Sequence, residues 1–111
     1  ANFMADRLAT GLADIPGVRM PWPRQVNEVF TILPGGIDRA LRAAGARYYD
    51  WGARGLTALE APGADEVFVR LVTSFATTRA DVDQFLKIAR AMADHQQNTD
   101  SLSVAASLDG I

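Results

Sequence analysis

The sequence contains no cysteine, one lysine (Lys87) and one histidine (His95) among its 111 residues. Without cysteine the chain has no disulfide framework and no thiolate metal site, and the cytoplasm is the expected compartment. Lysine, histidine and cysteine are also frequent nucleophiles and general bases, so this chain offers few reactive side chains for a complete active site. We expect any catalysis to need residues outside this chain.

A strong charge of one sign and a long apolar run are also missing. The formal net charge is −2, which gives no long-range field to attract nucleic acid or an anionic membrane. No apolar run approaches the roughly 20 residues of a membrane span, and the first residues do not resemble a secretory signal. The composition, 49% hydrophobic and 22% charged, is that of an ordinary globular domain. We expect neither a nucleic-acid partner nor a membrane partner.

Apolar periodicity and turn residues divide the chain into helices and strands. Apolar residues at three- and four-residue spacing predict helices over residues 2–15, 37–44 and 78–94. Runs rich in β-branched and aromatic residues predict strands over residues 18–20, 27–33, 46–51 and 67–75. Glycine and proline predict a turn at residues 34–36 and a loop over residues 52–65. The order α-β-β-α-β-β-α favours an α+β fold, in which a small antiparallel sheet of three to four strands has helices packed on one face.

The last helix and the residues after it define the expected domain. Thr78 is expected to cap this helix, with Asp81 at the third helical position. We expect residues 1–94 to form one domain. The polar residues 95–111 lack steady periodicity and are expected to form a flexible tail, with His95 exposed to solvent. The first helix begins almost without a lead-in and without an initiating methionine, so we expect the chain to be a piece of a longer protein.

The strand predicted over residues 67–75 is apolar on both faces. Alternation places Val67, Val69, Leu71 and Thr73 on one face, and Phe68, Arg70, Val72 and Ser74 on the other. A sheet with helices on one side only should be polar on its other side, so the pattern predicts a covering layer from another domain or subunit. On that second face Arg70 needs an anion or water beside it. It is either a solvated or ion-paired strand residue, or a bidentate fork for a carboxylate.

Several segments resemble, in matching order, the small C-terminal domain of bacterial low-specificity L-threonine aldolases. The longest is VRLVTSFATT at residues 69–78, followed by DVD at 81–83 and FL at 85–86. The others are QVNEVF at residues 25–30, LRAAGA at 41–46 and YYDWG at 48–52. The resemblance covers about residues 1–93. These aldolases are fold type I pyridoxal-phosphate enzymes of the β-eliminating lyase and threonine aldolase family.

The resemblance implies an activity and a role for one residue. In that family a large domain holds pyridoxal phosphate and supplies the cofactor lysine, and the small domain packs against it. An arginine on the late strand binds the α-carboxylate of the amino-acid substrate, and Arg70 is the matching position. The implied reaction is the retro-aldol cleavage of L-threonine or L-allo-threonine to glycine and acetaldehyde, by a homo-oligomeric parent enzyme. This chain alone would bind no cofactor and would be inactive.

Other candidate residues have simpler interpretations. Lys87 lies on the polar side of the last helix, four residues after Asp83, where a solvated ion pair is expected. Core packing or a domain interface is expected for three aromatic residues, Tyr48, Tyr49 and Trp51. An anion is in principle within reach of three loop arginines, Arg19, Arg24 and Arg54.

Two alternative functions remain open. The chain could be the small domain of another fold type I pyridoxal-phosphate lyase or of an aminotransferase, because carboxylate-binding arginine strands recur there. It could instead be a free-standing α+β interaction module whose second sheet face binds a protein.

Overall fold

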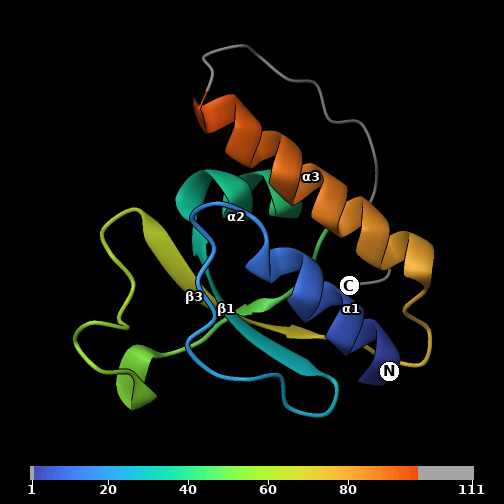
Figure 1. Cartoon of the computed structure of the whole chain (residues 1–111), viewed down its shortest axis with the longest axis horizontal. Coiled ribbons are helices and arrows are strands. Elements are labelled where there is room, and N and C mark those ends of the chain that lie inside the picture. The colour runs from blue at the N-terminus through green and yellow to red at the C-terminus, as the bar shows by residue number, and fades with distance from the viewer. Residues whose placement is uncertain (1, 98–111) are drawn as a thin grey trace.

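The computed structural model describes residues 2–97, which form three helices, three strands and one short 3₁₀ turn (Figure 1). In chain order these are α1 (Asn2–Ala13), β1 (Glu28–Pro34), α2 (Gly35–Ala43), β2 (Tyr49–Asp50), η1 (Ala53–Gly55), β3 (Glu66–Val72) and α3 (Arg79–Gln97). The predicted α+β class and small antiparallel sheet are confirmed.

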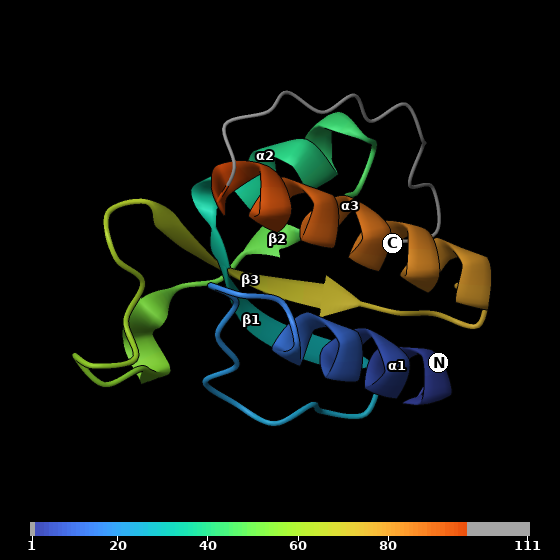
Figure 2. The same ribbon diagram turned by 45° about the horizontal axis from the view of Figure 1, so that its top comes forward.

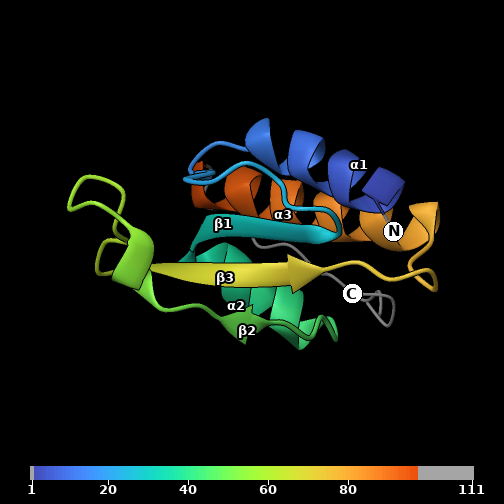
Figure 3. The same ribbon diagram turned by 90° about the horizontal axis from the view of Figure 1, so that it is seen from below.

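The sheet has the order β1-β3-β2, so the last strand in the sequence is the central one (Figure 3). β1 pairs antiparallel with β3 in the register that places Glu28 opposite Val72. β2 adds two residues on the other side of β3, where Tyr49 lies opposite Arg70. A central position suits β3, because β-branched and aromatic residues dominate its sequence.

All three helices lie on the same face of the sheet (Figures 1 and 2). α3 contacts both α1 and α2. The core between helices and sheet contains, among others, Leu8, Leu12, Val29, Leu33, Ile37, Leu41, Val69, Leu71, Phe85 and Ile88. Val69 and Leu71 point into this core, so the predicted alternation of β3 is confirmed.

Local signals end and begin the helices as predicted. α1 is followed by a turn with Gly17, whose φ of +88° favours glycine. α2 is followed by Gly45 at φ +105°. At the start of α3, the N–H of Asp81 donates to Oγ1 of Thr78 at 3.1 Å, and the N–H of Thr78 donates to Oδ2 of Asp81 at 2.9 Å. The predicted cap is therefore confirmed, and it is reciprocal.

Two of the predicted strands are absent or shorter. Residues 18–20 form a single bridge, in which Arg19 exchanges backbone hydrogen bonds with Ile32 at 3.0 and 2.8 Å. The proline that follows this segment has no N–H to donate, so the pairing stops. Residues 46–51 contribute only the two residues of β2, because Tyr48 is directed into the core.

The predicted turn at residues 34–36 is the start of α2, which follows β1 directly. The N–H of Gly35 donates to the carbonyl oxygen of Asp65 at 2.7 Å. An added Cβ at Gly35 would lie 2.7 Å from Oδ1 of Asp65. Glycine at position 35 therefore allows the loop before β3 to approach the start of α2 closely.

The predicted flexible tail over residues 95–111 is described only in its first part. α3 continues through His95 to Gln97, and His95 is half-buried in this helix. The expectation of an exposed, non-helical His95 is therefore wrong, and residues 98–111 lie outside the described residues. Between residues 2 and 97, no helix has the length and apolar character needed to cross a membrane.

Candidate functional site

The face of the sheet without helices is partly covered by the chain's own loops. Phe30, Ile32 and Phe68 form a small buried cluster on this face, and the loop residues Trp22 and Leu56 pack against it. The prediction that another domain or subunit must cover this face is therefore wrong over the cluster. Beside the cluster the helix-free face is open.

Trp22 contacts two of the three residues of the cluster. Its ring centroid lies 5.1 Å from that of Phe30 and 5.3 Å from that of Phe68, and both contacts are edge-on. Trp51 extends the cluster from Phe30 with an edge-on contact at 5.6 Å. Gly55 makes room for Trp22, because an added Cβ would lie 2.8 Å from Cζ2 of the indole. Aromatic pairs of this geometry contribute roughly 0.5–1.5 kcal/mol each beyond their burial, so the cluster is a firm support for its neighbours.

Arg70 lies at the edge of this cluster, on the central strand β3. Its guanidinium carbon is 4.7 Å from the centroid of the Trp51 ring, which is a cation–π distance. Its Nη1 donates to Oε1 of Glu28 on β1 at 3.4 Å, and its side chain is 27% exposed. This chain thus supplies Arg70 with both an aromatic ring and an anion. Arg70 lies on the helix-free face, as the alternation predicts.

Arg70 is held more loosely than three other arginines. Arg7, Arg19 and Arg42 each hold a carboxylate at 2.7 or 2.8 Å and make further hydrogen bonds. The contact between Arg70 and Glu28 is longer than the roughly 2.7–2.9 Å of a good charged pair. The Nε of Arg70 is buried and has no hydrogen-bond partner among residues 2–97. Nη2 also makes no hydrogen bond among these residues, so the guanidinium keeps an unused terminal donor besides the buried Nε, and a ligand site requires such a donor.

The loop arginines considered from the sequence are placed differently. Arg19 binds Glu66 at 2.7 Å and so fastens the loop before β3. This hydrogen bond holds the pKa of Glu66 below its usual range. Arg24 donates to a backbone carbonyl two residues further on, and Arg54 is exposed in η1. Arg19 and Arg24 thus have structural roles.

The three aromatic residues predicted for the core or an interface separate into two environments. Tyr48 is buried in the core, where its hydroxyl donates to Oδ1 of Asp38 at 2.6 Å. Burial, together with this hydrogen bond, raises the pKa of Tyr48 far above its usual range. Tyr49 and Trp51 are 70% and 38% exposed. Tyr49 pairs with Arg70 across the sheet, so its side chain points to the helix-free face.

Lys87 is exposed on α3, on the helix-covered side of the sheet. Asp83, its predicted partner, instead accepts hydrogen bonds from Nε and Nη2 of Arg7 on α1 at 2.8 and 3.0 Å. Lys87 and Arg70 therefore lie on opposite sides of the sheet, and the described residues do not by themselves fit pyridoxal phosphate. Within the same residues, no group of three or more histidine, aspartate or glutamate side chains is placed to hold a metal ion.

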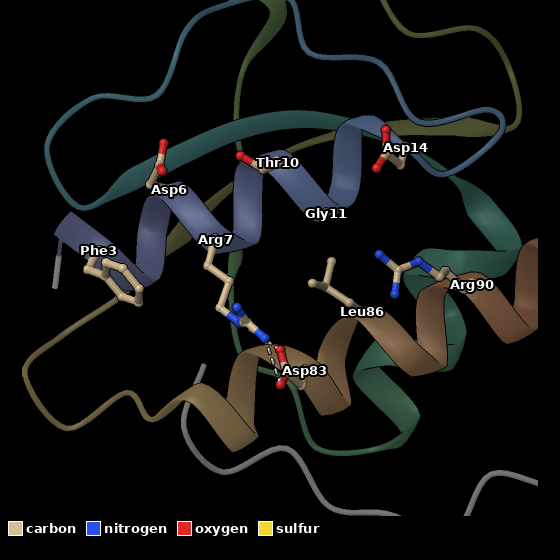
Figure 4. A pocket seen from close by; sticks show the side chains of 9 residues that line it. All are labelled: Phe3, Asp6, Arg7, Thr10, Gly11, Asp14, Asp83, Leu86 and Arg90. Atoms are coloured by element: carbon tan, nitrogen blue, oxygen red, sulfur yellow. Dashed lines mark hydrogen bonds and ion pairs between the residues drawn. The ribbon is translucent and has the colours of Figure 1, made fainter.

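A groove of about 420 Å³ lies between α1 and α3 (Figure 4). Its lining residues are Phe3, Asp6, Arg7, Thr10, Gly11, Asp14, Asp83, Leu86 and Arg90. The Arg7–Asp83 pair joins the two helices across it, as the dashed lines of Figure 4 show. Because charges of both signs line this groove, its electrostatics do not select one class of ligand.

No protein-family model matches this chain, and no curated protein matches it. A functional proposal therefore depends on the geometry around Arg70. Sequence alternation found Arg70 but missed Glu28 and Trp51 as its neighbours. Glu28, Phe30 and Ile32 alternate along one face of their strand. Pairing this strand with residues 67–75 would have placed Glu28 beside Arg70.

Proposed function

We propose that this chain is the small domain of a pyridoxal-phosphate-dependent L-threonine aldolase, and that Arg70 binds the α-carboxylate of the amino-acid substrate. The loosely held guanidinium of Arg70, which lies over the Trp51 ring and keeps Nη2 unused, is the observation that carries this proposal. The proposed reaction is the retro-aldol cleavage of L-threonine or L-allo-threonine to glycine and acetaldehyde. The proposed setting is a cytoplasmic homo-oligomer.

The proposed role of Arg70 is to orient the substrate. A planar guanidinium binds both oxygens of a carboxylate, which restricts rotation of the bound molecule. Because Nε is buried, Nη1 and Nη2 are the nitrogens that would make this contact. Trp51 supports the guanidinium from one side, so the carboxylate would approach in the guanidinium plane.

The proposed partner is a large domain that holds the cofactor, because the described residues do not fit it alone. Exposed apolar side chains lie next to Arg70: Tyr49 is 70% exposed and Val72 is 40% exposed. Exposed apolar surface beside a candidate ligand site is typical of a contact between domains. A domain docked here would exclude water and so strengthen the contact of Arg70 with a carboxylate.

The test is a chimera in which this chain replaces the small domain of a bacterial low-specificity L-threonine aldolase. We expect glycine release from L-threonine. For Arg70→Ala we expect kcat/KM to fall about 10–150-fold, because a hydrogen bond to a charged group contributes about 1.5–3 kcal/mol. Arg70→Lys should recover part of the activity, since lysine keeps the charge but not the planar fork. Arg54→Ala, at an exposed arginine in η1, is the matched control and should have no effect.

Cofactor absorbance and circular dichroism show whether each chimera is assembled. An assembled chimera that cleaves threonine equally well with Arg70 and with Arg70→Ala would contradict the proposal. Cofactor binding through a lysine, with threonine turnover, by the 111-residue chain alone would contradict it as well.

A free-standing interaction module is the second candidate function. Phe75, three residues after the end of β3, is 98% exposed, and Val72 at that end is 40% exposed. The reading frame upstream of Ala1 separates the two candidates, because the aldolase proposal requires a cofactor-binding domain there. Assays of the parent protein with threonine and with amino-donor pairs separate an aldolase from an aminotransferase.

A further inference from the structure

Glu28 and Arg70 form an open ion pair on the helix-free face. Nη1 and Oε1 are 3.4 Å apart, and the Arg70 and Glu28 side chains are 27% and 33% exposed. Among residues 2–97, the Glu28 carboxylate has no other hydrogen-bond partner. A carboxylate accepts up to about four hydrogen bonds and a guanidinium donates five, so both groups keep free capacity.

The pair of Arg42 and Asp38 is closed, in contrast to the open pair of Glu28 and Arg70. Nε of Arg42 donates to Oδ1 of Asp38 at 2.8 Å, and Nη2 donates to Asp50 at 2.7 Å. Asp38 also accepts the hydroxyl of Tyr48 at 2.6 Å. Both charges of that pair are satisfied within the chain. The pair of Glu28 and Arg70, by contrast, keeps a free donor and a free acceptor side by side. Among residues 2–97 the pair of Arg24 and Asp6 is open as well, but its charges are 3.7 Å apart and the Asp6 side chain is 71% exposed.

A tight and strained turn fixes the position of Glu28. The backbones of Gln25 and Glu28 exchange two hydrogen bonds, at 3.0 and 2.6 Å. Between them Val26 has φ +47°, a left-handed conformation that strains a β-branched residue. Nδ2 of Asn27 donates to the carbonyl of Thr73 at 2.7 Å and ties the turn to the chain after β3. Strain of this kind persists where the surrounding structure enforces it, often at functional sites.

The backbone register keeps the two charges together. Glu28 lies opposite Val72, and Arg70 lies opposite Phe30, so Glu28 and Arg70 are diagonal neighbours on one face. A plain carboxylate would be attracted by Arg70 and repelled by Glu28. An α-amino acid carries an ammonium group next to its carboxylate and can satisfy both charges at once.

We infer that Glu28 is a specificity-determining residue, and that the Arg70–Glu28 pair selects α-amino acids over carboxylic acids that lack an amino group. This inference rests on the proposed role of Arg70 as the carboxylate ligand. In this inference Glu28 binds the ammonium group of the incoming substrate. A built-in penalty against the wrong ligand is a common source of specificity.

The experiment compares glycine with glycolate, which has a hydroxyl in place of the ammonium group. Both are titrated at constant ionic strength into the ¹⁵N-labelled chain, and the indole N–H of Trp51 reports binding. We expect glycine to bind about two- to fivefold more tightly than glycolate, the range for a partly exposed ion pair. Glu28→Gln, which keeps the shape, should abolish this preference. Glu28→Asp should retain part of it.

Two control variants separate the inference from the proposed function. Asp14→Asn, an exposed carboxylate after α1, should leave the glycine-to-glycolate ratio unchanged. Arg70→Ala should abolish the response to both ligands, and retained binding would overturn the proposed role of Arg70. An unchanged ratio in Glu28→Gln, with binding still dependent on Arg70, would overturn the inference alone. The absence of any Trp51 response up to the solubility limit of both ligands would also overturn it.

Discussion

Trp51 determines the position of the Arg70 side chain through three contacts. Its backbone N–H donates to the carbonyl oxygen of Phe68 at 2.7 Å. The edge-on contact with Phe30, at 5.6 Å, fixes its ring, and the guanidinium carbon of Arg70 lies 4.7 Å from the ring centroid. At a partly exposed site such a cation–π contact contributes about 0.5–1 kcal/mol.

Trp51→Ala should therefore weaken the binding of glycine to the chain about two- to fivefold. Trp51→Phe should recover part of the loss, because a smaller aromatic face remains. The Nε–H resonance of Arg70 reports the titration. Trp22→Phe is the control, since Trp22 supports the cluster through Phe30 and Phe68. Equal affinities of the wild-type chain and Trp51→Ala would show that the ring does not position Arg70.

Glu66 gives the chain an acid-sensitive contact. Arg19 holds the pKa of Glu66 below its usual range, so folding favours the ionised carboxylate. The resulting stability is present above the unfolded pKa of about 4.3 and is lost as pH falls through the lower folded value. In urea titrations, Glu66→Gln should be less stable than the wild type by up to about 1 kcal/mol between pH 5 and 7. The difference should shrink below about pH 4, and one that stays constant down to pH 2 would contradict this account.

The face of Arg70 is predictable from alternation, because that rule acts within one strand. Its neighbours are not, since Glu28 and Trp51 reach Arg70 through strand pairing and through the end of β2. The packing of a loop residue over Phe68 was not predicted for the same reason. Trp22 is a loop residue without periodicity, and only the three-dimensional path of the chain brings it to β3.

At the scale of elements, predictions succeeded where local signals act. Apolar periodicity and glycine turns gave the three helices within a few residues. The strand predicted over residues 18–20 is absent and the one over residues 46–51 is shortened to β2, because a run of suitable residues becomes a strand only where it has a partner. Residues 18–20 have a single bridge, and Tyr48 takes part in the core instead of a ladder.

The reciprocal cap of α3 should stabilise the fold measurably. Thr78→Ala removes the acceptor for the N–H of Asp81 and should lower the free energy of unfolding by about 1 kcal/mol. Urea denaturation measures this change. Thr57→Ala is the matched control, because Thr57 and Glu60 exchange the same type of contacts in a loop, where no long helix depends on them. Equal losses in the two variants would contradict a special role for the cap.

At the scale of the whole molecule, the helix-free face of the sheet presents exposed apolar side chains. Tyr49 and Val72 are 70% and 40% exposed there. We expect the isolated chain to self-associate through this face, because exposed apolar patches favour contact. Sedimentation at several concentrations should show a rising average mass, and Val72→Lys should reduce it. A strict monomer at all concentrations would exclude this expectation.

A ribosome releases β1 and β2 before the strand that joins them. Neither of these strands is hydrogen-bonded to the other, and both pair with β3. The sheet therefore has no stable part until residues 66–72 have left the exit tunnel, and α3, which contacts both other helices, follows still later. The nascent chain must keep two unpaired strands from other partners until nearly all of the described residues are made, which makes co-translational protection by chaperones valuable to this fold.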